Sequence, residues 1–205
     1  METTDATAWW EQFYREDRGR WSGRPNRSLV DEVEGLTPGT ALDLGCGSGA
    51  DALWLAERGW TVTAVDISAT ALAAAARAHQ ASGLPPTAID WQRHDLAVSF
   101  PEGRFDLVAA SFLHSPVALP RTRVLRAAAA AVAPGGTLLV VGHLPSPEHP
   151  HVELPTPEEV VRALELPDGA WRLRTSDQRE VEHAFRDAAP STRVDGVVRL
   201  ERAAG

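Results

Sequence analysis

The stretch Thr40-Ala41-Leu42-Asp43-Leu44-Gly45-Cys46-Gly47-Ser48-Gly49 decides the fold of this chain. Its first half is largely apolar and indicates a buried strand. The three alternate glycines that follow let the backbone turn sharply and approach a ligand without Cβ atoms in the way. The next apolar run, residues 62–65, ends at Asp66. An acid about 20 residues after such a turn is placed to accept hydrogen bonds from ribose hydroxyls, so the pattern predicts a site for an adenosine-containing cofactor.

The glycine spacing by itself fits two classes of cofactor, because Gly45-x-Gly47-x-x-Ala50 also satisfies the dinucleotide fingerprint. Asp43 separates the two classes. Its negative charge inside the turn would repel a pyrophosphate, whereas it would attract an ammonium and a sulfonium group. The sequence therefore favours S-adenosylmethionine over NAD.

The run Asp43-x-Gly45-x-Gly47-x-Gly49 resembles the first motif of the class I S-adenosylmethionine-dependent methyltransferases, and the resemblance extends from about residue 9 to the C-terminus. The segment Trp21-Ser22-Gly23-Arg24-Pro25-Asn26 resembles the lid of the small-molecule members, including the thiopurine and tellurite-resistance groups. The resemblance implies a parallel sheet closed by an antiparallel hairpin, with methyl transfer as the activity.

Length and composition limit the classes of protein. At 205 residues the chain should form one domain, and its net charge of −8 disfavours binding to a nucleic-acid backbone. No apolar run approaches the roughly 18 residues that cross a membrane, and residues 1–5 lack the basic start of a signal peptide, so we expect a soluble cytoplasmic protein. The chain has no lysine, which excludes Schiff-base chemistry. The single Cys46 is expected to be a small residue that fits the turn.

Residue periodicity predicts an α/β fold. Helices are expected at residues 6–17, 29–35, 50–58, 69–81, 120–132 and 156–164, and strands at 40–44, 60–65, 88–92, 105–110, 137–142, 171–183 and 193–202. Alternating strands and helices make a parallel sheet, while two consecutive strands pair antiparallel. We expect a single Rossmann-like methyltransferase domain over residues 1–205, with a mostly parallel seven-stranded sheet, a C-terminal antiparallel hairpin and helices on both faces.

Three parts of this domain have different expected roles. Residues 1–28 would form an N-terminal helix and a lid, residues 36–143 the cofactor-binding core, and residues 144–205 a helix and the hairpin. In the lid, Tyr14, Trp21 and Asn26 could shape the acceptor pocket or could simply pack the helix. Trp9 and Trp10 are expected to pack the helix onto the sheet.

The cofactor should lie across the carboxyl ends of the first four strands, at the switch point of the sheet. Gly45 and Gly47 would bring backbone groups to its methionine end, with Asp43 nearby. Asp66 would hold the ribose, although it could instead cap the next helix, a role that Ser68 can also fill.

The adenine and the sulfonium have separate candidate residues. Ile67 would lie against the adenine face. Asp95 and Leu96 resemble the family's acidic motif, which implies a carboxylate for the adenine amino group and a backbone amide for a ring nitrogen. Ser111 ends the fourth strand, where the resemblance implies closure over the sulfonium.

His114 is the candidate general base, because it follows the fourth strand on the active face. A half-exposed loop histidine is the alternative. His143, His149 and His151 could suggest a metal, but no cysteine joins them and prolines constrain their loop, so no metal site is expected.

The sequence thus predicts an S-adenosylmethionine-dependent methyltransferase acting on a small molecule. A non-catalytic module that binds the cofactor is one alternative. A nicotinamide-dependent oxidoreductase is the other, and Asp43, Asp95 and the terminal hairpin disfavour it. The acceptor atom and the oligomeric state stay open.

Overall fold

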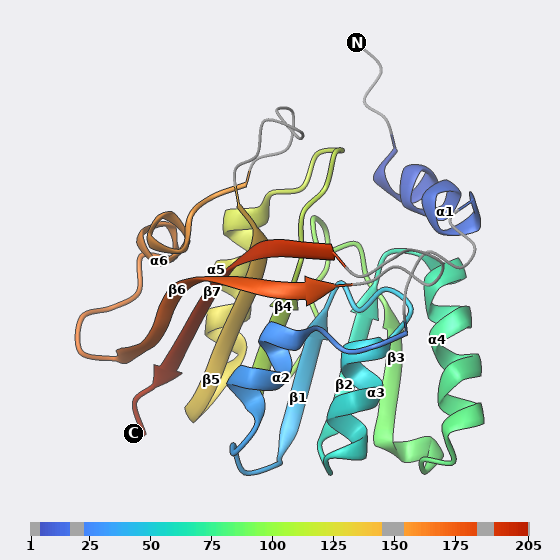
Figure 1. Cartoon of the computed structure of the whole chain (residues 1–205), viewed down its shortest axis with the longest axis horizontal. Helices are drawn as coiled ribbons and strands as arrows, with labels where there is room; N and C mark the ends of the chain where they lie inside the picture. The colour runs from blue at the N-terminus through green and yellow to red at the C-terminus, as the bar shows by residue number, and fades with distance from the viewer. Residues whose placement is uncertain (1–4, 17–22, 145–153, 184–190, 205) are drawn as a thin grey trace.

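The structure, a computed structural model, describes residues 5–16, 23–144, 154–183 and 191–204 (Figure 1). Its centre is a seven-stranded sheet in the order β3-β2-β1-β4-β5-β7-β6. The parallel strands are β1 (Thr40–Leu44), β2 (Thr61–Asp66), β3 (Ile89–Arg93), β4 (Phe105–Ser111) and β5 (Val132–His143). β6 (Trp171–His183) and β7 (Ser191–Arg202) add an antiparallel hairpin. The predicted fold class is confirmed.

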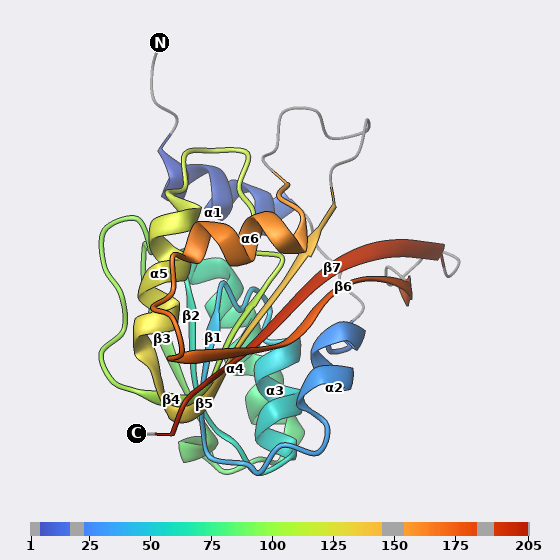
Figure 2. The same cartoon turned by 90° about the vertical axis from the view of Figure 1, so that its left-hand side faces the viewer.

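Helices cover both faces of the sheet (Figure 2). α2 (Arg27–Val33) and α3 (Ala50–Glu57) lie on one face, and α5 (Arg121–Ala131) and α6 (Pro157–Leu164) lie on the other. α4 (Ala69–Ser82) packs along β2 and β3, and a short 3-10 turn, Pro86–Ala88, leads into β3. β1 is buried along four of its five residues, as expected for a parallel strand covered on both sides.

The start of β5 departs from the prediction. We expected the strand at residues 137–142 because Pro134-Gly135-Gly136 should break it, but it begins at Val132. Gly135 adopts a positive φ of 80°. The pairing with β4 shifts register, from Phe105 opposite Val132 to Leu107 opposite Thr137. The Pro-Gly-Gly segment is therefore absorbed as a bulge, which lets the strand continue.

The N-terminal helix α1 (Ala6–Glu16) lies at the end of the sheet where the parallel strands finish, above α4 (Figure 1). It contacts α4 and has no buried residue. The prediction that Trp9 and Trp10 pack this helix onto the sheet is therefore wrong. Their rings instead form an aromatic cluster with Phe13 and Tyr14 along the helix itself.

Glu32 fastens α2 to the C-terminal hairpin. Its side chain is 6% exposed and forms ion pairs with Arg179 and, at 3.4 Å, with Arg199 Nη1. Thr175 Oγ1 donates a hydrogen bond to it at 2.9 Å. A nearly buried carboxylate is stable only when it is paired in this way.

None of the helices in the described ranges is both long enough and apolar enough to cross a membrane.

We predict that Glu32→Gln lowers the free energy of unfolding by about 1–3 kcal/mol, because two guanidinium groups lose their carboxylate. Glu165→Gln is the matched control, since the Arg126–Glu165 pair at 2.7 Å has side chains that are 43% and 70% exposed. It should cost less than about 0.5 kcal/mol. Urea denaturation measures both, and equal losses would contradict the anchoring role of Glu32.

Candidate functional site

Backbone hydrogen bonds hold the glycine turn against the end of β2. Gly45 N and Cys46 N both donate to Val65 O, at 2.8 and 2.9 Å. Gly47 N donates to Asp66 Oδ2 at 2.9 Å. The turn is therefore fixed from both sides, by the strand that precedes it and by the strand beside it.

Gly49 has a structural reason for being glycine. It adopts a positive φ of 85°, and a Cβ there would lie 2.6 Å from Trp91 Cη2 and 2.9 Å from Ala75 Cβ. Gly47 differs, because its added Cβ would meet only the Tyr14 ring, with the hydroxyl 3.0 Å away. The open face of the turn is thus at Gly47, under α1.

Asp66 ends β2 and is buried. Its Oδ1 accepts a hydrogen bond from Ser68 N at 2.9 Å, and its Oδ2 accepts the one from Gly47 N. Ser68 itself caps α4, since its Oγ accepts from Ala71 N at 3.2 Å. Burial raises the pKa of Asp66, although the backbone N–H groups act in the opposite direction. Ser68 therefore fills the capping role, which leaves the remaining lone pairs of Asp66 for a ligand.

Asp43 lies beneath the turn in an acidic cluster with Asp51 and Asp66. It is 1% exposed, and its Oδ2 has no hydrogen-bond partner among the described residues. Burial, Asp51 and Asp66 raise the pKa of Asp43 well above its usual range. Burial also raises the pKa of Asp51, whose Oδ1 accepts a hydrogen bond from Asn26 N at 2.6 Å. Such a cluster favours a positively charged ligand.

Sequence reasoning did not single out Asp51. The available signal was an acid in the first turn of the helix that follows the glycine turn. The same environment affects the thiol of Cys46, because burial and then Asp43 raise its pKa well above the usual value. Cys46 is therefore no reactive thiolate, in agreement with its predicted role as a small residue.

Four buried polar atoms converge on this region without a hydrogen-bond partner in the described part of the chain. They are Asn26 Nδ2, Asp43 Oδ2, Ser111 Oγ and His114 Nδ1. Ser111 Oγ lies near the Asp51 carboxylate but forms no hydrogen bond of acceptable geometry. Buried polar groups in folded proteins nearly always have a partner, so this set indicates a place for a polar ligand.

A cleft joins most of the predicted site residues. Its lining comes from α1 (Ala6, Trp10, Tyr14), from Gly45, from the end of β2 (Asp66, Ile67), from residues after β3 (His94, Asp95, Leu96) and from residues after β4 (Phe112, Leu113, His114, Ser115, Ala118, Leu119). With α1 in place its volume is about 90 Å³, below the roughly 300–1,000 Å³ of typical ligand pockets. Ala6, Trp10 and Tyr14 of α1 therefore narrow the space in front of the glycine turn.

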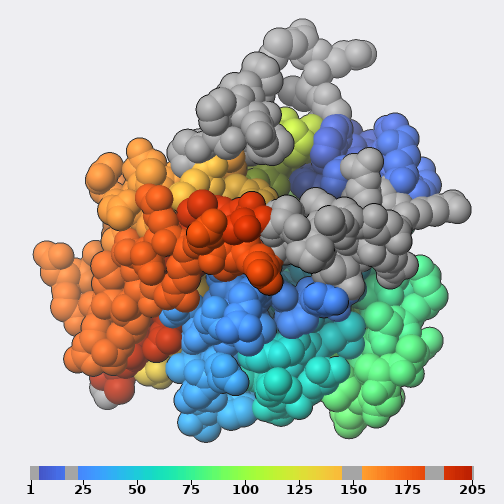
Figure 3. Space-filling view, viewed as in Figure 1, coloured from blue at the N-terminus to red at the C-terminus, as the bar shows by residue number. Residues whose placement is uncertain are grey.

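Glu11 ties α1 to the start of α4. Its Oε1 accepts a hydrogen bond from Ala69 N, and its Oε2 accepts one from Thr70 Oγ1, each at 2.6 Å. Burial opposes the charged form of Glu11, but these hydrogen bonds outweigh it and lower the pKa. Figure 3 shows α1 on the outside of the molecule, at the upper right. Arg93 Nη2 lies 3.9 Å from Glu11 Oε1, so β3 also approaches this helix.

Asp95 lines the cleft from the segment that follows β3. Its Oδ1 accepts a hydrogen bond from Ala97 N at 2.9 Å, and its carbonyl accepts from Val98 N and Ser99 N. These bonds fold residues 95–99 into a tight turn that fixes the direction of the carboxylate. Leu96 follows directly and lines the same cleft.

The segment after β4 is strained. Phe112 has a φ of 52°, which is a genuine outlier for a bulky residue. Its N–H donates to Val141 O at 2.8 Å, and its carbonyl accepts from His114 N at 2.7 Å. The Phe112 ring stacks on His143, with centroids 4.5 Å apart, and carries the Arg193 guanidinium at 4.3 Å. Sequence reasoning missed Arg193, because nothing local links residue 193 to strand β4.

His114 lines the cleft, but its hydrogen bonding does not suit a base. Its Nε2 accepts a hydrogen bond from His143 N at 3.2 Å, so the ring proton belongs on Nδ1, the atom without a partner. Burial, followed by Arg121 and His143, lowers the pKa of His114 to about 3. The neutral ring therefore offers a hydrogen-bond donor to a ligand.

Three of the sequence-predicted residues cannot be placed. Trp21, from the expected lid, and His149 and His151, from the histidine-rich loop, lie outside the described residues. Asn26, also assigned to the lid, caps α2 by accepting a hydrogen bond from Ser28 N at 3.0 Å.

The chain is similar in sequence and fold to known proteins. The protein family described as "Methyltransferase domain" matches residues 41–136. The chain is 32% identical over 160 residues to the 2-heptyl-1-hydroxyquinolin-4(1H)-one methyltransferase of Mycobacteroides abscessus, covering 76% of this chain and 70% of that protein. A solved structure described as "Conversion of a Disulfide Bond into a Thioacetal Group during Echinomycin Biosynthesis" has a TM-score of 0.75 at 23% identity, over 96% of this chain and 93% of that one.

A third relative shares only part of its length. The chain is 38% identical over 112 residues to the ribosomal RNA small subunit methyltransferase C of Chromohalobacter salexigens. That match covers 52% of this chain and 32% of the relative, so the chain spans about a third of that protein.

We predict that Asp43→Asn stabilises the ligand-free protein at pH 8. The folded chain binds the Asp43 proton more tightly than the unfolded chain does, so wild-type stability falls as the pH rises from about 4 through the raised pKa. The amide removes this loss, and each kcal/mol gained raises Tm by about 2–4 °C. Thermal scans at pH 4.5 and pH 8 should show a gain at pH 8 that shrinks at pH 4.5.

Asp90→Asn is the control, because Asp90 is exposed on β3, which β2 separates from β1. A wild type more stable than Asp43→Asn, by a margin that grows with pH, would mean that the Asp43 carboxylate has a stabilising partner.

Proposed function

The chain belongs to the class I S-adenosylmethionine-dependent methyltransferase family, and we propose that it transfers the methyl group of S-adenosylmethionine to a small-molecule nucleophile. The observation that carries the proposal is the set of unpartnered buried polar atoms beside the glycine turn. These atoms match the charged methionine end of that cofactor. S-adenosylmethionine supplies an electrophilic methyl group on a sulfonium.

The acidic cluster is the proposed receptor of the positive charges. Asp43 Oδ2 would accept from the α-ammonium, and a nearby cation favours the ionised carboxylate against the burial that raises its pKa. Asn26 Nδ2 is a donor and suits the α-carboxylate. The backbone of Gly45 and Gly47 would approach the same end of the cofactor.

The nucleoside would lie toward β2 and β3. Asp66 has lone pairs left for the ribose hydroxyls after accepting from two backbone N–H groups. Ile67 lies next to it in the cleft and would cover the adenine face, while Asp95 and Leu96 would receive the adenine edge. Ser111 would close over the sulfonium from the end of β4.

The acceptor is proposed to be a small molecule. A net charge of −8 disfavours binding to a nucleic-acid backbone, although one relative is named for ribosomal RNA. The relative that aligns with 76% of this chain is named for a hydroxyquinolinone with a heptyl chain, which supports an acceptor of that size. We propose a cytoplasmic location, since methyl transfer from this cofactor requires its cellular pool.

The chain's own contribution to rate would be alignment and the exclusion of water, since methyl transfer is an in-line displacement. The helix α1 would close the cleft through Tyr14, and Trp21 and Asn26 belong to the same proposed lid. His114 Nδ1–H would donate a hydrogen bond to the acceptor and orient its nucleophilic atom.

We predict that S-adenosylmethionine and S-adenosylhomocysteine bind more tightly than NAD, and that Asp66→Asn weakens both adenosyl ligands by about 1–3 kcal/mol, or about 5- to 150-fold. Ribose hydroxyls lose a charged acceptor in that variant. Isothermal titration calorimetry measures the affinities, with Asp90→Asn as the control. Tighter binding of NAD would end the methyltransferase proposal.

We predict that His114→Asn keeps kcat/KM within about tenfold of the wild type, whereas His114→Leu loses more, because the amide still donates a hydrogen bond. With a pKa of about 3, His114 should produce no inflection in kcat/KM between pH 5 and pH 8. A loss of about 10²- to 10⁴-fold in both variants, with an inflection in that range, would instead support a general base.

A further inference from the structure

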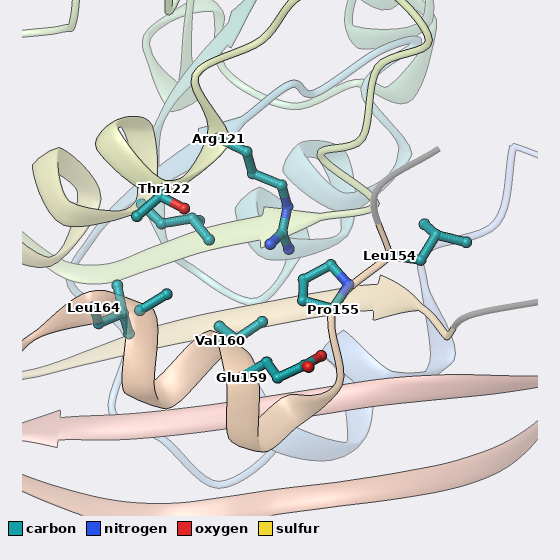
Figure 4. Close-up of a pocket in the computed structure, with 9 residues that line it drawn as sticks. Arg121, Thr122, Leu154, Pro155, Glu159, Val160 and Leu164 are labelled. Atoms are coloured by element: carbon teal, nitrogen blue, oxygen red, sulfur yellow. The ribbon is translucent and has the colours of Figure 1, made fainter. Parts of the chain in front are cut away.

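A second cavity of about 350 Å³ lies between α5 and α6 (Figure 4). Its lining comes from the start of α5 (Arg121, Thr122, Leu125), from the two residues before Thr156 (Leu154, Pro155) and from α6 (Glu159, Val160, Ala163, Leu164). The volume is that of a small-molecule site. It lies on the α5 and α6 face of the sheet, outside the cleft proposed for the cofactor.

The lining of this α5–α6 cavity combines apolar side chains with one cationic group, Arg121, and one anionic group, Glu159. Leu125, Val160 and Leu164 supply apolar surface from facing helices. The Oε2 of Glu159 accepts a hydrogen bond from Thr156 N at 2.8 Å in the capping box of α6, which holds this carboxylate at the start of the helix. Figure 4 shows the Arg121 side chain extending from the start of α5 toward Pro155. The lining therefore combines an apolar body with a guanidinium at one end.

Arg121 connects this cavity to the cofactor cleft. Its Nε donates to Leu113 O at 3.0 Å, and Leu113 lines the cleft. At Gly142 of β5, an added Cβ would lie 2.8 Å from His114 Nε2 and 3.8 Å from Arg121 Nη2. Arg121 and His114 therefore both lie close to Gly142. Arg121 lines the α5–α6 cavity, and His114 lines the cofactor cleft.

We propose that the α5–α6 cavity holds the apolar body of the methyl acceptor, and that Arg121 receives an ionised oxygen of that acceptor. The acceptor class is then a small amphipathic molecule with an acidic hydroxyl. This inference rests on the proposed function, because it assigns a substrate to the same active site.

The chemistry of this acceptor fits the guanidinium of Arg121 and the neutral ring of His114. A guanidinium stabilises an ionised oxygen, so the acceptor arrives without its proton and needs no base from His114. A lone pair of that oxygen forms the new C–O bond while the C–S bond breaks, and the electrons of the C–S bond stay on sulfur as a neutral thioether. Charge balances, because the anionic oxygen becomes a neutral methyl ether and the sulfonium becomes a neutral thioether.

The test is binding of 4-hexylbenzoate, an amphipathic anion, measured by calorimetry in the presence of S-adenosylhomocysteine. We expect one site, and at least about tenfold weaker binding of benzoate, which lacks the apolar chain. Ala163→Phe fills the cavity and should weaken 4-hexylbenzoate at least tenfold. Ala130→Phe, on the exposed side of α5, is the matched control and should leave binding unchanged.

The charge is tested at Arg121. Arg121→Met should weaken 4-hexylbenzoate about tenfold or more, and Arg121→Lys should restore part of the affinity because it keeps the cation. Far-ultraviolet circular dichroism and the affinity for S-adenosylhomocysteine show whether each variant is folded. Absent binding of 4-hexylbenzoate, or equal effects of Ala163→Phe and Ala130→Phe, would overturn the proposal.

Proximity to the cofactor is a separate readout. Inter-ligand nuclear Overhauser effects should join the aromatic protons of 4-hexylbenzoate to the methylene protons beside the sulfur of S-adenosylhomocysteine, and their absence would overturn the acceptor role. Failure of the two proposals is distinguishable. If S-adenosylhomocysteine binds and 4-hexylbenzoate does not, only the cavity assignment fails. If 4-hexylbenzoate binds and S-adenosylhomocysteine does not, the methyltransferase proposal fails.

Discussion

The attachment of the glycine turn to the end of β2 is the constraint on which the site depends. Gly45 N, Cys46 N and Gly47 N all donate to the last two residues of that strand, Val65 and Asp66. This attachment places the Asp66 carboxylate beside the turn and buries Asp43 beneath it. Three acids, counting Asp51, then share one poorly solvated region, where burial raises the pKa of each and the charges of Asp51 and Asp66 further raise the pKa of Asp43. The arrangement lowers the stability of the ligand-free chain, and a cationic ligand offsets that cost.

The N-terminal helix α1, which forms part of the proposed lid, is hydrogen-bonded to residues that follow the end of β2. Glu11 of α1 accepts hydrogen bonds from Ala69 and Thr70, which come directly after the segment that begins with Asp66. Because α1 has no buried side chain, this contact and the Tyr14 ring over Gly47 account for much of its position. The helix that covers the cleft is therefore held by polar contacts at the edge of the cleft, which water can replace when the helix moves. Entry of a ligand would then require little disruption of the two apolar cores.

The sequence predicted the features that depend on residues close together in the chain. The bounds of β1 and β6 agree with the prediction, and the cleft gathers Gly45, Asp66, Ile67, Asp95, Leu96 and His114 because parallel strands end at one edge. The exceptions depend on distant residues. Glu32 is paired with arginines about 150 positions away, and Arg193 covers Phe112 from β7. β5 was predicted too short, because a Pro-Gly-Gly run can form a bulge when a neighbouring strand supplies partners. The roles of all the predicted site residues toward a ligand stay predictions.

The assignment of His114 shows why position in a fold does not settle chemistry. The sequence placed an imidazole after β4 on the active face, and its residue type suggested a base. The backbone N–H of His143 then decides the tautomer, because it can only donate, which makes Nε2 the acceptor and leaves the proton on Nδ1. Burial and then the nearby Arg121 lower the pKa of His114 to about 3, because a protonated ring would be poorly solvated and would stand beside a second cation. A neutral donor beside a guanidinium is suited to holding an acceptor that is already anionic. The proton chemistry of the reaction would then lie in the acceptor's own acidity, and specificity for acidic acceptors would follow from the absence of a competent base.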